Sequence, residues 1–144
     1  MKKLIIIIIT LGLLSSIFSI TTSAAIKDDE IAPLYNNVLL EKTTFTIDSN
    51  GNAIISLLYR GKTGANSTAV ITSKIQKNVS GTWVDVDNGQ SNNQWVDEST
   101  STVFSLNHSV QLTSRGTYRA VVVYEISGTG GATDVIERTI EKTY

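Results

Sequence analysis

The chain has 144 residues, and its 12 basic and 13 acidic side chains leave it without the basic stripe that nucleic-acid binding requires. It contains no cysteine and one histidine, which excludes a disulfide framework and a cluster of histidine metal ligands. With 41% apolar and 17% charged residues, the composition favours one folded domain over a disordered chain.

The first 25 residues have the composition of a signal peptide. Two lysines precede an apolar run over residues 4–20, and Ser23 and Ala25 then occupy the positions that a signal peptidase favours. The run is at the lower length limit for a bilayer span, so an uncleaved membrane anchor is the alternative. We expect cleavage after residue 24 or 25 and release of a secreted, extracellular protein that has no membrane contact.

The remaining chain divides into residues 26–42 and residues 43–144. The first part contains three consecutive acidic residues and the only proline, Pro33, and it predicts an N-terminal arm with a short edge strand at residues 37–40. From residue 43 onward, apolar and polar residues alternate with a period of two, and no window shows helical periodicity. The sequence therefore predicts one all-β domain over residues 43–144.

Turn signals separate the alternating segments of this domain. In chain order, we expect strands over residues 43–47, 52–59, 68–77, 83–86, 103–112, 117–126 and 134–142, with a short edge segment over 95–100. About seven strands at this spacing predict a sandwich of two antiparallel sheets. We expect the core to contain Phe45, Ile47, Ile55, Leu57, Ile71, Ile75, Phe104, Leu106, Val110, Tyr118, Ala120, Val122 and Ile140.

Residues 116–120, with the sequence Gly-Thr-Tyr-Arg-Ala, resemble the tyrosine corner of immunoglobulin-like sandwiches. In that motif a tyrosine hydroxyl bonds the backbone a few residues upstream, near residues 112–115 in this chain. The resemblance makes Tyr118 the corner tyrosine and puts Ala120 where the second disulfide cysteine stands. It implies a disulfide-free, immunoglobulin-like β-sandwich.

Residues 74–83, together with the strand that begins at residue 116, are similar to an uncharacterised family of small secreted proteins of Gram-positive bacteria. The similarity implies export and a β-sandwich. It implies no activity and identifies no site residues.

The tripeptide Trp-Val-Asp occurs twice, at residues 83–85 and 95–97, on either side of a polar loop. Aromatic rings on a sandwich face stack against sugars, while polar neighbours bond the hydroxyl groups. The alternative is that one or both tryptophans cover the edge of the core, since tryptophan is largely buried on average. The candidate ligand-binding residues are Trp83, Trp95, Asp85 and Asp97.

Signals for catalysis are weak. His108 alternates in register with Leu106 and Val110, which favours a structural or edge role for the histidine. Paired carboxylates can hydrolyse glycosides, but acidic residues beside Asn and Gly more often form turns. The chain has no nucleophile elbow, no complete calcium loop and no phosphate loop. We predict no catalytic residues, no metal site and no cofactor. The carboxylates that could form such a pair are Asp85, Asp87, Asp97 and Glu98.

These observations together favour a secreted, non-catalytic binding or interaction module. Its partner would be an extracellular glycan of the cell wall or matrix, or another protein. One alternative is a structural surface or matrix component that assembles by strand addition. A second alternative is a small extracellular glycosidase-like enzyme.

Overall fold

The computed structural model describes residues 34–144, so the expected signal peptide lies outside the described part. These residues form eight strands and one short 3-10 turn, and every strand pairing is antiparallel. No helix within residues 34–144 is long and apolar enough to cross a membrane. The elements are β1 (Val38–Ile47), β2 (Asn52–Gly61), β3 (Thr68–Val79), β4 (Thr82–Asp85), η1 (Ser91–Asn93), β5 (Trp95–Ser99), β6 (Val103–Gln111), β7 (Thr117–Gly128) and β8 (Gly131–Thr143).

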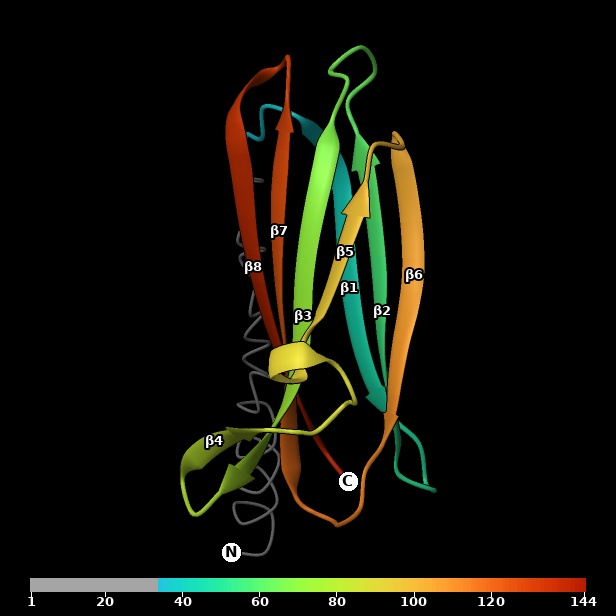
Figure 1. Ribbon diagram of the computed structural model, residues 1–144, viewed down its shortest axis with the longest axis vertical. Coiled ribbons are helices and arrows are strands. Elements are labelled where there is room, and N and C mark those ends of the chain that lie inside the picture. The colour runs from blue at the N-terminus through green and yellow to red at the C-terminus, as the bar shows by residue number, and fades with distance from the viewer. Residues whose placement is uncertain (1–33) are drawn as a thin grey trace, which may run out of the picture. The chain divides into compact units, whose positions relative to one another are not determined.

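The strands form two sheets (Figure 1). The first has the order β1-β2-β6, and the second has the order β4-β3-β7-β8. Strand β5 also pairs with β3, on the edge shared with β4. The first, second and sixth strands form one sheet, and the other strands form the second. This is the antiparallel, immunoglobulin-like arrangement that the sequence predicts. The short edge segment expected over residues 95–100 is strand β5, which forms its own ladder with β3 and brings the number of strands to eight.

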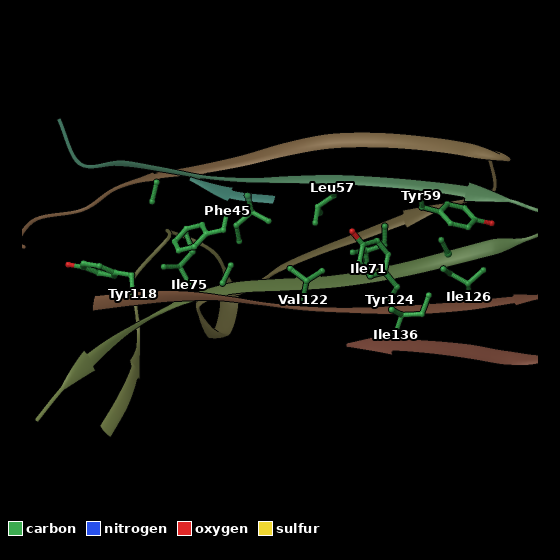
Figure 2. Close-up of a cluster of buried hydrophobic side chains, with 14 of the residues drawn as sticks. Phe45, Leu57, Tyr59, Ile71, Ile75, Tyr118, Val122, Tyr124, Ile126 and Ile136 are labelled. Atoms are coloured by element: carbon green, nitrogen blue, oxygen red, sulfur yellow. The ribbon is translucent and has the colours of Figure 1, made fainter. Parts of the chain in front are cut away.

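The core lies between the sheets and follows the period-two alternation of the strands (Figure 2). Strand β7 shows this most clearly, since every second residue from Tyr118 to Ile126 is buried. All the expected core residues on β2, β3 and β7 are buried. Five expected members are only half-buried, because they stand on edge strands that have a neighbour on one side alone: Ile47, Phe104, Leu106, Val110 and Ile140. Seven further buried residues on the strands join the core as well: Val38, Ala53, Tyr59, Ala69, Tyr124, Ile126 and Ile136.

The edge strand expected at residues 37–40 is the start of β1, so the sheet begins inside the segment that the sequence predicts to be an N-terminal arm. Strand β1 starts at Val38, and Asn37 is completely buried. The carboxylate of Asp134, on β8, accepts the backbone N–H groups of Asn36 and Asn37 at 2.8 and 2.6 Å. The Asn37 amide donates to the carbonyl of Ala132 at 2.9 Å. Residues 36–42 therefore belong to the sandwich, because buried polar contacts tie them to the β7–β8 hairpin.

Side chains close the sandwich on the side where β1 lies against β8. Arg138 forms an ion pair with Glu41 at 2.9 Å, and the Glu41 side chain is almost fully buried. Beside this pair, the hydroxyls of Thr43 and Tyr124 are 2.8 Å apart. Burial raises the pKa of Tyr124 to about 12, so its hydroxyl stays protonated. The edges of β1 and β8 are thus covered by each other.

Candidate functional site

Trp83 and Trp95 lie on opposite faces of the same sheet. Both stand on strands that pair with β3, where Trp83 is opposite Asn78 and Trp95 is opposite Ser73. Asn78 and Ser73 are five positions apart, and successive side chains of a strand point to opposite faces. Ser73 is buried between the sheets, so Trp95 points inward and Trp83 points outward. The expected surface made by the two tryptophans together does not form.

The same register separates the two aspartates. Asp85 is opposite Gln76 and Asp97 is opposite Ile71, again five positions apart on β3. The repeated tripeptide therefore makes two half-sites with different neighbours. One is an outer cluster around Trp83 and Asp85, and the other is an inner cluster around Trp95 and Asp97.

The outer cluster is a chain of polar contacts on the exposed face of the sheet. The Arg119 guanidinium lies 4.3 Å from the centroid of the Trp83 ring and donates to the Gln76 side chain at 2.8 Å. The Gln76 amide in turn donates to Asp85 at 2.6 Å, and Lys74 lies 3.0 Å from the same carboxylate. Partial burial acts to raise the pKa of Asp85, but the bonds from Gln76 and Lys74 outweigh it and lower the pKa. Asp85 is therefore an ionised, fully partnered carboxylate.

The inner cluster joins the two sheets at their other side. His108 of β6 stacks on Trp95 of β5, with ring centroids 4.7 Å apart and planes 6° from parallel. The Nε2 atom of His108 lies 2.7 Å from the Asp97 carboxylate. Trp95 also packs against the core. This arrangement agrees with a structural role for His108 and with the alternative that Trp95 covers the edge of the core. The contact between His108 and Asp97 was not expected.

The tyrosine corner forms as predicted. The Tyr118 hydroxyl donates to the carbonyl of Ser114 at 2.6 Å, four residues upstream. Ala120 is fully buried two residues later. Within its own sheet, Ala120 lies opposite Ile75 of β3 and Ile140 of β8.

A pocket of about 240 Å³ opens at the same end of the sandwich, between the β3–β4 hairpin and the loop from β6 to β7. Ser80 and Gly81 both have positive φ angles, 53° and 89°, which suits a two-residue hairpin turn. The end of β3 and strand β4, which this turn joins, bend away from the rest of the sheet (Figure 1). Tyr118 and four aliphatic side chains line the pocket. The aliphatic residues are Val79, Val84, Val86 and Leu112.

Polar groups surround the mouth of this pocket, which we call the hairpin pocket. Lys77 donates to the Ser114 hydroxyl at 2.6 Å and lies over the Tyr118 ring, 5.7 Å from its centroid. Asp85 and Asp87 also line the pocket. The alternation of β4 places Trp83 on one face of the hairpin and Val84 on the other. No sequence pattern predicts this pocket, because its position depends on where the hairpin leaves the sheet.

The remaining acidic motifs form turns. The Asp48 carboxylate accepts the backbone N–H groups of Asn50 and Asn52, and Asp87 accepts that of Gly89. Glu98 is exposed on the outer face of β5. Within residues 34–144 no group of three or more potential ligands is placed to hold a metal ion.

Comparison of the chain with protein-family models, curated proteins and solved structures finds no match. The similarity to small secreted Gram-positive proteins therefore stays a prediction. Function is inferred from the geometry of the described residues alone.

Proposed function

We propose that this protein is an exported, non-catalytic module that binds an extracellular protein through the hairpin pocket. The observation that carries the proposal is the exposure of aliphatic residues at the mouth of the pocket. Val79 and Val84 are each 49% exposed, although they face a cavity beside the core. Grouped, exposed apolar side chains with a polar rim are typical of interaction sites.

The lining of the pocket favours a protein over a glycan. Sugars stack on the open faces of aromatic rings, but the one aromatic ring in this pocket is that of Tyr118, which is 2% exposed. Aliphatic walls suit an apolar side chain of a peptide or a loop. The charged groups of Lys77 and Asp87 at the rim would orient the polar backbone of such a segment.

Glycan binding at the outer cluster is the second candidate. Trp83 is only half-buried, and amide, carboxylate and cationic groups lie next to its ring. These groups could bond sugar hydroxyls while the open face of the indole stacks on the sugar ring. Arg119 already covers one face of that indole, which leaves a smaller platform than two tryptophans would offer.

The test is a binding screen of the purified protein against a displayed peptide library and a glycan array. We expect peptides with aliphatic residues to bind, and Val84→Asp to weaken binding about tenfold or more by placing a charge in an apolar contact. Val135→Asp is the matched control, since Val135 is similarly exposed, at 57%, but lies on β8 away from the pocket. It should leave binding unchanged.

The other outcomes separate the alternatives. Glycan binding that Trp83→Ala abolishes and Val84→Asp leaves intact would move the ligand to the outer cluster. Hydrolysis of a polysaccharide that is lost in Asp85→Asn or Asp97→Asn would overturn the non-catalytic part of the proposal.

A further inference from the structure

Most of the strands that border the two sheets are protected against pairing with another chain. Strand β4 has 4 residues and β5 has 5. Strands β1 and β8 lie against each other through the ion pair of Glu41 with Arg138. Short length, charge and coverage are the usual means by which proteins prevent edge-to-edge association.

Strand β6 is neither short nor charged, and its contact with β5 through the His108 side chain leaves its outer backbone edge unpaired within residues 34–144. It is 9 residues long, contains no proline, aspartate, glutamate, lysine or arginine, and pairs with β2 in an uninterrupted register. A long, regular edge strand without charge is a template for adding another strand.

The hydrogen-bonding groups on the free side of β6 can be assigned from its two ends. The carbonyl of Thr102 accepts from Gly61, and the N–H of Leu112 donates to Gly51, so even-numbered residues direct their backbone groups toward β2. Backbone direction alternates along a strand. The odd-numbered residues therefore direct their N–H and C=O groups away from β2: Val103, Ser105, Asn107, Ser109 and Gln111. Within residues 34–144 no backbone bond to these outward groups is formed.

These five residues are arranged symmetrically about Asn107. When a second β6 runs antiparallel with Asn107 opposite the partner's Asn107, Ser105 lies opposite the partner's Ser109. Val103 then lies opposite the partner's Gln111. Every outward N–H and C=O group finds a partner in this register, because all five residues fall in hydrogen-bonded pairs. A charged strand that pairs with a second copy of itself can bring like charges opposite each other. Strand β6 contains no aspartate, glutamate, lysine or arginine, so this repulsion does not arise.

The inward side chains of β6 also favour a second strand beside it. Phe104, Leu106 and Val110 are only half-buried, since β6 has a neighbour on one side. The same antiparallel register places Phe104 opposite the partner's Val110. Apolar cross-strand pairs of this kind stabilise a sheet.

We propose that two copies of this chain pair through β6, antiparallel about Asn107, and join their three-stranded sheets into one six-stranded sheet. A two-fold axis through the Asn107 pair makes the contact self-complementary and closed. The segment before β1 is a poorer occupant of this edge, because residues 26–33 contain three consecutive acidic residues and a proline.

Sedimentation velocity of the purified protein over a concentration series tests the proposal. We expect a reversible dimer in the wild type. Asn107→Lys should weaken dimerisation about tenfold or more, because the two lysines would face each other across the axis. Asn107→Pro should abolish it by removing the central N–H groups. Thr139→Lys is the control, since Thr139 is exposed on the edge strand β8.

Crosslinking locates the contact independently. The chain has no cysteine, so Asn107→Cys introduces a single thiol that a short bismaleimide should join to the thiol of the second copy. Thr139→Cys should give no crosslinked dimer. Circular dichroism of every variant should match the wild type, because Asn107 is exposed and its backbone groups do not bond β2.

Three results would overturn the proposal. The first is a protein that stays monomeric up to millimolar concentration. The second is a dimer that tolerates Asn107→Lys and does not crosslink at position 107. The third is a dimer that is lost when residues 26–33 are deleted, which would assign the β6 edge to that segment.

Discussion

The His108 imidazole lies 2.7 Å from the Asp97 carboxylate, and this contact joins the edges of two different sheets. Asp97 stands on β5 and His108 on β6, strands that share no ladder. Trp95, two residues before Asp97, stacks on the same imidazole. The polar bond and the aromatic contact together hold the two sheets to each other on one side of the sandwich. The ion pair of Glu41 with Arg138 lies on the opposite side.

This contact predicts an energetic coupling between Asp97 and His108. His108→Phe keeps an aromatic ring against Trp95 but removes the bond to Asp97, and Asp97→Asn weakens the same bond from the other side. Both side chains are below a fifth exposed, so we expect a coupling energy of about 1 kcal/mol in a double-mutant cycle. Urea denaturation of the four proteins gives the value. Additive effects of the two changes would show that the contact contributes nothing.

The tyrosine corner predicts different effects for two buried tyrosine hydroxyls. Tyr118→Phe removes the bond to Ser114 and should lower the free energy of unfolding by about 0.5–1.5 kcal/mol. Tyr59→Phe is the matched control, because the Tyr59 hydroxyl is buried and has no hydrogen-bond partner. Removing that hydroxyl should be neutral or stabilising. Equal denaturation midpoints for the two variants would contradict the assignment of the corner.

The lowered pKa of Asp85 predicts a specific dependence of stability on pH. Because the folded pKa lies below its ordinary value of 3.8, the ionised carboxylate stabilises the fold above that pH, and this contribution disappears as the pH falls through the folded pKa. Asp85→Asn should therefore be less stable than the wild type at neutral pH, with a difference that shrinks below about pH 4. Thermal denaturation between pH 2 and pH 7 measures this. A difference that stays constant over the whole range would contradict it.

The signal-peptide prediction concerns residues outside the described part of the chain. Intact-mass analysis of protein from the culture medium of an exporting host should give a chain that begins at or near Ile26. Replacing Ala25 with a bulky residue should slow processing, because the peptidase requires a small side chain there. Full-length protein found in membranes alone would support the uncleaved anchor instead.

Much of the fold could be predicted from the sequence because β-alternation is local. The side chains of Ile71 and Ile75 are buried as expected, since each residue's face depends only on its position within its own strand. The corner role of Tyr118 was predicted from the resemblance of residues 116–120 to a known motif, and that motif is also local, because it joins residues four positions apart. The half-buried state of Phe104 could not be predicted in this way, because it depends on β6 being an edge strand.

The positions of the two tryptophans could not be predicted from the sequence. Their local pattern shows that two Trp-Val-Asp segments flank a polar loop and that each alternates as a strand. Whether Trp83 and Trp95 share a face depends on which residues of β3 lie opposite them. Those two residues of β3 are five positions apart, so the tryptophans lie on opposite faces. Register between strands is set by long-range packing rather than by the residues of one segment. The hairpin pocket, the contact of Asp97 with His108 and the free edge of β6 arise from the same long-range pairing.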